Sequence, residues 1–434
     1  MSTVVRHLGL VDVAEGTTQS PVPTAAAGHK PLRIQLWSYN YDPEPTGIGP
    51  VSRVLAEGLR DRGHQMDVVA AHPHYPIPRW GPCRRPYREV RNGIPVLRLP
   101  LWIGRASTSE RYRQELSFMA AQFAALPALG RPDVLVATSP SFPALLPAMV
   151  NARARRIPWI LWLQDILPDG AATTGLVKPG LVMAAARRLE RAAYRNTDLV
   201  VVPSRSFTAN LVRKGIPDSK VRLIHPPATR VPARPTSAPN AGPLRVLSIG
   251  NIGFSQGLAP LVASFERSAA MRERGVELVI TGSGVAAEHL RKEIVSDRVR
   301  MLGVVDDERL DAELRQAHIA LVGQHHGGAE FNIPSRLMNF MTYGLPVLAA
   351  VSPAGEVARI IRDSGGGWVV DSSEPDGFPT QLKELLDKPD ELSERGRRAA
   401  EYAQRHFSQE GVAQRFEEAI EHAATPGSGR SAQA

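Results

Sequence analysis

Cysteine and aromatic residues are scarce in this chain of 434 residues. Cys83 is the only cysteine, which excludes an intramolecular disulfide and any zinc cluster built from cysteines, and fits a reducing compartment. Aromatic side chains make up only 6% of the sequence and no nucleic-acid-binding motif is recognised, so we expect no nucleic-acid partner. His325 and His326 are adjacent, but neighbouring side chains diverge and no third ligand is evident, so no metal site is predicted.

Long hydrophobic runs are also missing. Two uncharged stretches, Leu116–Gly130 and Val134–Ala152, are each short for a bilayer crossing of about 20 residues, and prolines interrupt them. Arginines flank both stretches, so an apolar face fringed with arginine could lie on an anionic membrane. A helix and a strand in a domain core are an equally good interpretation. Residues 1–30 lack the apolar segment of a secretion signal, and we expect disordered tails at 1–30 and 426–434.

Acidic residues are in deficit over the first half of the chain. The formal net charge is +9, but residues 1–230 hold 30 Lys and Arg against 16 Asp and Glu, an excess of 14 positive charges. The remainder holds 22 Lys and Arg against 27 Asp and Glu. A basic front half favours an anionic partner such as a phosphorylated substrate or a phospholipid surface.

The sequence repeats one plan twice. Each copy begins with an apolar segment, continues through a glycine-containing loop and a helical segment to an Arg-Gly pair, and ends with a second apolar segment. The first copy runs from Leu32 to the glycine Gly63 and the second from Leu244 to Gly275, and both intervals are 31 residues. Apolar strands that alternate with helices predict two doubly wound α/β domains in tandem. Residues 226–243 contain six prolines and no regular pattern, which predicts a linker. Later strands are expected at Val134–Ala137, Trp159–Leu163, Leu199–Val202, Arg300–Leu302, Ile319–Val322 and Val347–Ala350.

The segment 333–347 is the most informative stretch. We expect Ser335 to cap a helix of about ten residues that ends at Gly344. The free amides at Ser335–Leu337 and the guanidinium of Arg336 would form a phosphate site, and Asn339, one turn further, could bind a hydroxyl group. Phosphate and hydroxyl recognition on one helix favours a nucleotide sugar. A capped helix that leads into a buried strand would also explain the pattern.

Three more loops follow predicted strands, at the edge of the sheet where ligands of such folds bind. Gly47 and Gly49 let the backbone approach a ligand, and the helix after them offers free amides. Gly282 and Gly284 could make backbone contacts to phosphate. Asp165 is the candidate for a catalytic or acceptor-positioning group, with capping of the following loop as the alternative.

Four motifs together resemble glycosyltransferase family 4 of the GT-B fold, most closely the bacterial exopolysaccharide and O-antigen transferases of the colanic-acid type. They lie at residues 39–49, 164–169, 250–257 and 334–336, and the resemblance covers about residues 31–420. It implies an α/β fold of two Rossmann-like, doubly wound parallel-sheet domains facing a central cleft. It also implies retaining transfer from a nucleotide-diphosphate sugar with no metal or other cofactor. The implied parts are an N-terminal acceptor domain at 31–226, a linker at 227–243, a C-terminal donor domain at 244–406 and a helix at 407–425 that returns to the N-terminal domain.

Several positions depart from the family pattern. Gln164 stands where relatives often carry a histidine that contacts the donor sugar. Asn251 and Gln256 replace an arginine and a lysine that neutralise the diphosphate, and Arg336 is the expected substitute.

Two glutamates common in the family are replaced as well. The later position is Asn339, and the earlier falls on Phe331, with Glu330 adjacent and its participation left open. Val304 resembles the segment whose backbone recognises the base. The predicted catalytic residues are Gln164, Asp165 and Arg336, and the predicted donor-binding residues are Gly47, Gly49, Gly250, Asn251, Gln256, Gly282, Gly284, Val304, Glu330, Pro334, Ser335, Leu337 and Asn339.

The leading hypothesis is a retaining, hexosyl-type glycosyltransferase of bacterial polysaccharide synthesis. Its partners would be a nucleotide sugar, a polyprenyl-diphosphate-linked glycan acceptor and the anionic inner face of the cytoplasmic membrane, where it would bind peripherally. One alternative is a sugar-nucleotide 2-epimerase of the same fold, which would need carboxylates and histidine around the sugar. The other is a catalytically silent binding subunit, suggested by the amides that replace charged groups.

Overall fold

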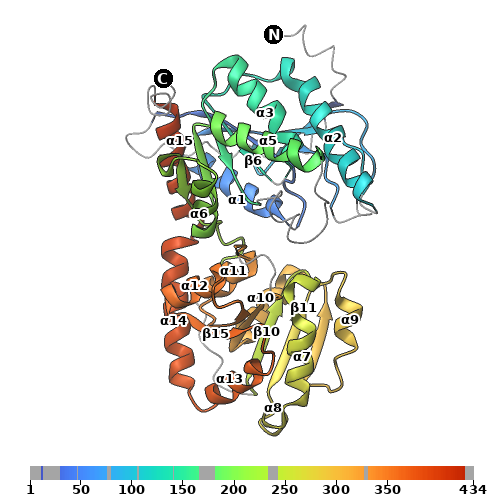
Figure 1. Cartoon of the computed structure of the whole chain (residues 1–434), viewed down its shortest axis with the longest axis vertical. Coiled ribbons are helices and arrows are strands. Elements are labelled where there is room, and N and C mark those ends of the chain that lie inside the picture. The colour runs from blue at the N-terminus through green and yellow to red at the C-terminus, as the bar shows by residue number, and fades with distance from the viewer. Residues whose placement is uncertain are drawn as a thin grey trace. The chain divides into compact units, whose positions relative to one another are not determined.

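The chain forms two compact units in the computed structural model, which describes residues 11–12, 30–45, 47–75, 80–104, 107–139, 141–165, 181–232, 243–326 and 331–425. One unit contains Met1–His225 and takes up the chain again for Val412–Ala434, and the other contains Pro226–Gly411. Figure 1 shows that each unit is built around its own sheet, with helices beside it.

The sheet of the first unit has nine described strands in the order β1-β4-β5-β3-β2-β6-β7-β8-β9. All neighbours are parallel except β4 and β5, which are antiparallel. The strand order reverses between β2 and β6, and such a reversal is where ligands bind in doubly wound sheets. The strands are β1 Val11–Asp12, β2 Arg33–Ser38, β3 Gln65–Ala71, β4 Tyr87–Arg91, β5 Ile94–Leu99, β6 Val134–Thr138, β7 Trp159–Trp162, β8 Leu199–Val202 and β9 Val221–Leu223.

The helices of the first unit include one from the far end of the chain. The described helices are α1 Ile48–Asp61, α2 Thr108–Ala125, α3 Phe142–Arg155, α5 Leu181–Asn196, α6 Arg205–Arg213 and α15 Gln409–Ala424. The Phe416 ring of α15 packs on Trp162 of β7 with centroids 4.9 Å apart. The Glu417 carboxylate accepts hydrogen bonds from Arg62 at 2.6 Å and bonds His64 at 3.0 Å. The last described helix, α15, is therefore part of the core and polar network of the first unit.

The second unit has a six-stranded, fully parallel sheet in the order β12-β11-β10-β13-β14-β15. Its order reverses between β10 and β13. The strands are β10 Arg245–Ile249, β11 Glu277–Thr281, β12 Val299–Gly303, β13 Ile319–Gly323, β14 Val347–Val351 and β15 Gly367–Asp371. The helices are α7 Leu258–Arg267, α8 Ala269–Glu273, α9 Ala287–Arg291, α10 Asp307–Gln316, α11 Ser335–Thr342, α12 Glu356–Ser364, α13 Gly377–Leu385 and α14 Pro389–His406.

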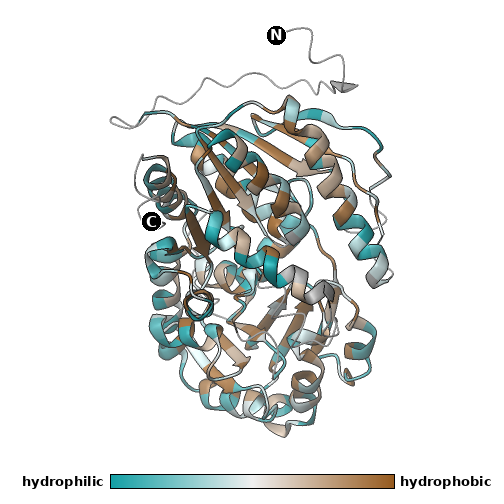
Figure 2. Ribbon diagram, turned by 45° about the horizontal axis from the view of Figure 1, so that its top comes forward, coloured by the Kyte–Doolittle hydropathy of each residue, from teal (hydrophilic) through white to brown (hydrophobic). Residues whose placement is uncertain are grey.

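Both faces of the centre of this second sheet are buried, which is why β13 and β14 are apolar along their whole length. Leu247 of β10 contributes to one core cluster, whereas its neighbour Val246 contributes to the cluster on the other face. Successive side chains of a strand point to opposite faces, so a sheet covered on both sides needs continuous apolar strands. In Figure 2, which is coloured by hydropathy, strands of both sheets are largely brown, the colour of hydrophobic residues.

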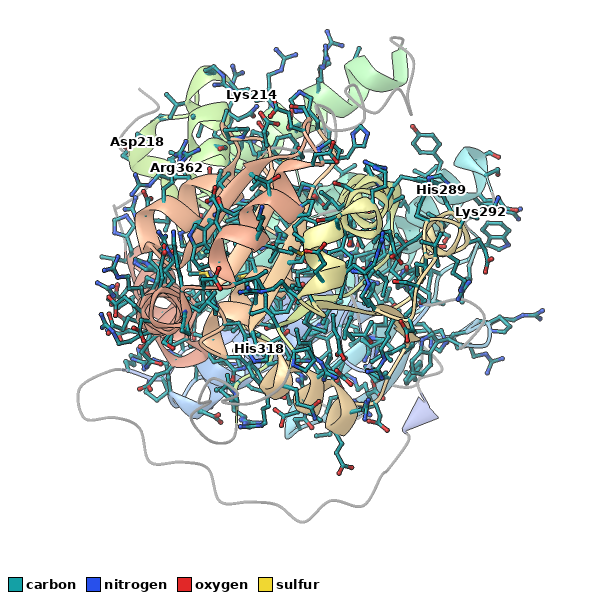
Figure 3. All side chains as sticks on the ribbon, turned by 90° about the horizontal axis from the view of Figure 1, so that it is seen from below. Lys214, Asp218, His289, Lys292, His318 and Arg362 are labelled. Carbon is teal, nitrogen blue, oxygen red and sulfur yellow. The ribbon has the colours of Figure 1, made fainter. Side chains whose placement is uncertain are left out.

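The predicted fold class is confirmed, and the repeated plan has a structural counterpart. β2 pairs with β3 through Arg33 and Gln65, and β10 pairs with β11 through Arg245 and Glu277, an interval of 32 residues in both units. His318, labelled in Figure 3, accepts a hydrogen bond from the Arg245 amide at 3.1 Å and anchors the amino end of β10.

Five strands, β1, β4, β5, β9 and β15, were not anticipated. β4 and the edge strands β9 and β15 lack the long apolar pattern of the central strands. β5 is largely buried, but Pro95 and Arg98 interrupt its apolar residues. Val11–Asp12 lies in the segment expected to be a disordered tail, but it pairs in parallel with β4. Two residues are too few to carry a periodic signal. Among the described helices, none combines the length and the apolar composition that a membrane crossing requires.

Candidate functional site

The carboxyl edge of the second sheet brings two glycine-containing loops together, one after β10 and one after its neighbour β11. Gly250 follows β10 with φ of 111°, and Gly282 follows β11 with φ of 130°. A Cβ atom on Gly282 would lie 1.8 Å from the Gly250 carbonyl oxygen, and one on Gly284 would lie 2.3 Å from the Ile252 carbonyl oxygen. The absence of side chains at these glycines lets the two loops pack against each other. The predicted backbone contacts of the loops to phosphate require this close packing.

Arg336 places a buried guanidinium group at the same edge. Its Nη2 atom donates a hydrogen bond to the carbonyl oxygen of Gly323, the last residue of β13, at 2.9 Å. A Cβ atom on Gly250 would lie 3.8 Å from Nη1 of Arg336. The side chain is only 8% exposed, and its buried Nε atom has no hydrogen-bond partner among the described residues.

Burial lowers the pKa of Arg336 to about 10, so the group remains a cation near neutral pH. Within the described ranges, Arg336 forms no ion pair with a carboxylate. A buried charge normally has a partner, because desolvation is costly without one. The arrangement is therefore suited to an anionic ligand.

The beginning of α11 differs in detail from its prediction. Pro334 occupies the N-cap position, and Ser335 is the first helical residue and makes no side-chain cap. The Leu337 amide donates to the Pro334 carbonyl oxygen at 2.9 Å, and the Leu337 side chain is in the core. The prediction that Ser335 caps the helix was wrong, because the residue with the N-cap backbone conformation is Pro334, one position earlier. First-turn amides are left open by helix geometry, and those of Ser335 and Arg336 remain the candidate anion donors.

Two other predicted donor-binding side chains, those of Gln256 and Asn339, already have contacts within the chain. Gln256 donates a side-chain hydrogen bond to the Asn251 carbonyl oxygen. The Asn339 Oδ1 atom accepts hydrogen bonds from the amides of Thr229 at 3.0 Å and Arg230 at 3.2 Å. Asn339 therefore holds the segment that enters the second unit, and its predicted contact to a ligand hydroxyl stays a prediction.

Val304 and Glu330 are the other predicted donor-binding residues of the second unit. Val304 is exposed on the loop after β12, and its backbone contact to a base stays a prediction. Glu330 lies outside the described residues. Among the described residues, no group of three or more His, Cys, Asp or Glu side chains could hold a metal ion.

The first unit carries polar groups at the carboxyl ends of β6 and β7. The Ser139 Oγ atom accepts hydrogen bonds from the amides of Gln164 at 2.9 Å and Asp165 at 3.4 Å. Burial raises the pKa of Asp165 to about 6. The Gln164 Nε2 atom is buried and has no partner among the described residues. Ser139 was missed by the sequence reasoning, although its place directly after a predicted strand was a usable signal.

The loop that contains Gly47 and Gly49 is organised by a buried carboxylate that the sequence reasoning did not assign. Glu44 Oε1 accepts hydrogen bonds from the amides of His74 at 3.0 Å and Tyr75 at 2.8 Å, and from Asn40 Nδ2 at 3.0 Å. Burial raises the pKa of Glu44 more strongly than these hydrogen bonds lower it. Gly49 is the second residue of α1, and a Cβ atom on it would lie 2.9 Å from the Glu44 carbonyl oxygen, so the loop packs tightly against the start of the helix. Gly47 immediately precedes α1, with φ of 68°.

Comparison with known proteins matches each unit to a family model of glycosyl transferases. The family model described as "Glycosyl transferase 4-like domain" matches residues 46–227, and the one described as "Glycosyl transferases group 1" matches residues 232–406. WcaI of Escherichia coli (strain K12), whose name is that of a colanic acid biosynthesis glycosyl transferase, is 26% identical over 409 residues, which are 89% of this chain and 98% of WcaI. WbjE of Pseudomonas aeruginosa, named as a glycosyltransferase, is 24% identical over 248 residues, 54% of this chain and 60% of its own.

Solved structures share the fold at low sequence identity. Sucrose-phosphate synthase from Thermosynechococcus elongatus superposes with a TM-score of 0.68 at 18% identity, over 90% of this chain and 98% of the other. WaaG, a glycosyltransferase involved in lipopolysaccharide biosynthesis, gives a TM-score of 0.62 at 15% identity, over 89% and 99%. With both units matched in sequence and the architecture matched in structure, the chain is a GT-B glycosyltransferase that belongs to family 4 and resembles the enzymes of bacterial exopolysaccharide synthesis.

Proposed function

We propose that this glycosyltransferase is a retaining enzyme that takes a hexosyl group from a nucleotide-diphosphate sugar. The observation that carries the proposal is the buried Arg336 guanidinium, held by the Gly323 carbonyl oxygen and close to Gly250 without a described carboxylate partner. Structural relatives support the donor class: Anabaena HepE was solved with UDP and with UDP-glucose, and Arabidopsis starch synthase IV with ADP and acarbose. A diphosphate is the anion that such a site would hold.

The chemistry places negative charge where Arg336 can stabilise it. The bond between the anomeric carbon and the terminal phosphate oxygen breaks through an oxocarbenium-like transition state, and charge grows on the leaving diphosphate. A guanidinium group makes two charge-assisted hydrogen bonds to such a phosphate. The anomeric carbon bonds to the acceptor hydroxyl oxygen, and the hydroxyl proton passes to the leaving phosphate. The resemblance to family 4 supports retention of configuration, and no protein base is assigned.

Asp165 and Gln164 are the candidates for binding sugar hydroxyl groups in the first unit. With a pKa of about 6, Asp165 is mostly ionised at pH 7 and can accept a hydrogen bond from a hydroxyl group. Gln164 offers a buried amide donor. The pair would orient a hydroxyl group through one acceptor and one donor.

The acceptor is proposed to be a glycan linked to polyprenyl diphosphate at the inner face of the cytoplasmic membrane. The excess of basic residues in the first 230 positions supports an anionic surface as partner, since each basic residue near such a surface contributes about 1 kcal/mol. The likeness to enzymes of polysaccharide synthesis supports the glycan. The epimerase is not proposed, because both family models are described as glycosyl transferases.

The experiment is transfer from a panel of UDP-, GDP- and ADP-sugars to lipid-linked glycans extracted from a strain that lacks the gene, with the product linkage read by NMR. Retention predicts that the new linkage has the anomeric configuration of the donor. Arg336→Ala should abolish transfer, whereas Arg272→Ala, which removes an exposed charge from α8, should not. An inverted linkage would refute the retaining mechanism, and equal activity of both variants would refute the role of Arg336.

A further inference from the structure

The opposite edge of the first sheet contains a cavity that the transfer reaction does not use. It has a volume of about 510 Å³ and lies at the amino end of β7, where Trp159 begins the strand. The carboxyl ends of α3 and α5 and the segment before β9 also line it. Gln164 and Asp165 follow the other end of β7, so this cavity belongs to a different edge. Its volume is within the range of small-ligand sites, about 300–1,000 Å³.

Basic side chains dominate the cavity. Arg153, Arg156, Arg195 and Lys220 line it, and Asp198 is its only carboxylate. None of the four cations forms an ion pair with a carboxylate in the part of the chain that the structure describes. The Asp198 Oδ2 atom accepts the Trp159 amide at 2.9 Å, and its charge partly offsets the lowering of the Lys220 pKa that burial causes.

The simplest explanation is that these cations neutralise the partial negative charges at the carboxyl ends of α3 and α5. However, the positive charge of the four side chains is larger than the negative charge of these helix ends. Each helix end carries about half a negative charge. Two ends and Asp198 together amount to about two negative charges against four positive ones. The surplus of about two matches a phosphate monoester, which carries about −1.5 to −2 at pH 7.

The walls of the cavity are held in place by contacts that leave cationic groups available. Lys220 Nζ donates to the carbonyl oxygens of Arg195 at 3.0 Å and Thr197 at 2.9 Å. Arg153 Nη1 donates to Asn196 Oδ1 at 3.3 Å and links α3 to α5. Arg156 ends α3 in the left-handed conformation, with φ of 52°, a position that glycine or asparagine fills more easily. An arginine at this position bears a backbone cost and adds a charge to the cavity.

We propose that this cavity is a second anion site, separate from the donor site, that binds a terminal phosphate group with Arg156 and Arg195 as its principal ligands. The phosphate could belong to a soluble phosphorylated compound or to the monoester headgroup of an acidic phospholipid. Both sources present the same dianion, and they are separated by the test.

Calorimetric titration of the full chain with inorganic pyrophosphate should show a binding event that persists in Arg336→Ala. Measured in the Arg336→Ala background, which removes binding at the donor site, this event should weaken about 100-fold when Arg156→Ala and Arg195→Ala are added, because two charge-assisted contacts are lost. The control Arg187→Ala/Arg188→Ala removes the same charge from exposed positions of α5 outside the cavity and should bind like the unmodified protein. Equal weakening in the control, or undiminished binding in the double variant, would overturn the proposal.

Vesicle flotation identifies the source of the phosphate. Vesicles of phosphatidylcholine are mixed with phosphatidic acid or, at equal surface charge, with phosphatidylglycerol, which is a diester. A preference for phosphatidic acid that the double variant loses assigns a lipid headgroup. Pyrophosphate binding without such a preference assigns a soluble compound. If the unmodified protein neither binds pyrophosphate nor prefers phosphatidic acid, the cavity is not a phosphate site.

Discussion

Arg336 of α11 donates a hydrogen bond to the carbonyl oxygen of Gly323 at the end of β13, at 2.9 Å. This contact holds a positive charge at the point where the strand order of the second sheet reverses. The protein provides Arg336 with a neutral carbonyl partner and with no described carboxylate. The charge is therefore held in place without being neutralised, which is the condition for binding an anion tightly.

Replacement of Arg336 should separate binding from stability. Arg336→Ala should weaken nucleotide-diphosphate binding by about 2 kcal/mol, roughly 30-fold, and Arg336→Lys should recover only part of this because an ammonium group lacks the bidentate geometry. Arg336→Met should raise the melting temperature of the free protein, since a buried cation without a counter-ion is removed. Calorimetry and thermal melting measure the two effects. Unchanged affinity in Arg336→Ala would exclude it from the donor site.

The raised pKa of Asp165 predicts opposite effects on stability and turnover. An acid whose folded pKa is about 6, above the ordinary 3.8, destabilises the fold when ionised, and this cost grows from pH 4 to pH 6 and then stays constant. Asp165→Asn should therefore raise the melting temperature at pH 7, with a gain that shrinks toward pH 4. It should also lower kcat and remove the rise in activity near pH 6. A pH profile of the variant that keeps this rise would contradict the assignment.

Gly282 offers a matched pair of glycine substitutions. Gly282→Ala would place a Cβ atom 1.8 Å from the Gly250 carbonyl oxygen, so we expect a loss of more than about 3 kcal/mol of unfolding free energy, and of donor binding. Gly275 also has positive φ, at 63°, but a Cβ atom there meets nothing within 4 Å. Gly275→Ala should therefore cost only about 1 kcal/mol. Chemical denaturation of both variants tests the difference, and equal losses would show that close packing at Gly282 is unimportant.

Glu417 should stabilise the attachment of α15 in the first unit. Burial by itself raises the pKa of Glu417, but hydrogen bonds from Arg62 and His64 outweigh it and leave the pKa lowered. The stabilisation is therefore complete above the ordinary value of 4.5 and is lost as pH falls through the lowered folded pKa. Glu417→Gln should cost about 2 kcal/mol at pH 7. Glu418→Gln, at an exposed position one residue further, should cost almost nothing, and a similar loss in both variants would contradict the role of Glu417.

Membrane attachment should depend on charge and on salt. Liposome flotation at low salt should recover the protein with anionic vesicles and not with neutral ones, and high salt should reduce recovery, because it shortens the screening length. Equal recovery in the soluble fraction under all four conditions would reject peripheral binding and favour a soluble acceptor.

Local patterns were sufficient for the architecture. Continuous apolar strands such as Val134–Ala137 can be stable only inside a sheet covered on both faces, and their alternation with helices determines a parallel, doubly wound order. The repeated interval between Leu32 and Gly63 marked both units because a strand, a helix and a return strand need a similar length of chain. Short edge strands such as β9 were missed, since three residues carry no periodicity.

For the candidate site too, the sequence predicted the positions of residues, and the tertiary structure decided their contacts. The sequence by itself placed Gly250, Gly282, Asp165 and Arg336 after strands or at the start of a helix, where the edges of such sheets bind ligands. Only the tertiary structure decided which of their polar groups are available. In the folded chain, Arg336 lies close to Gly250 and has no described counter-ion. The side chains of Gln256 and Asn339, by contrast, are hydrogen-bonded to Asn251 and Thr229. Periodicity and capping act over a few neighbouring residues, whereas the pairing of a buried polar group depends on every element that surrounds it.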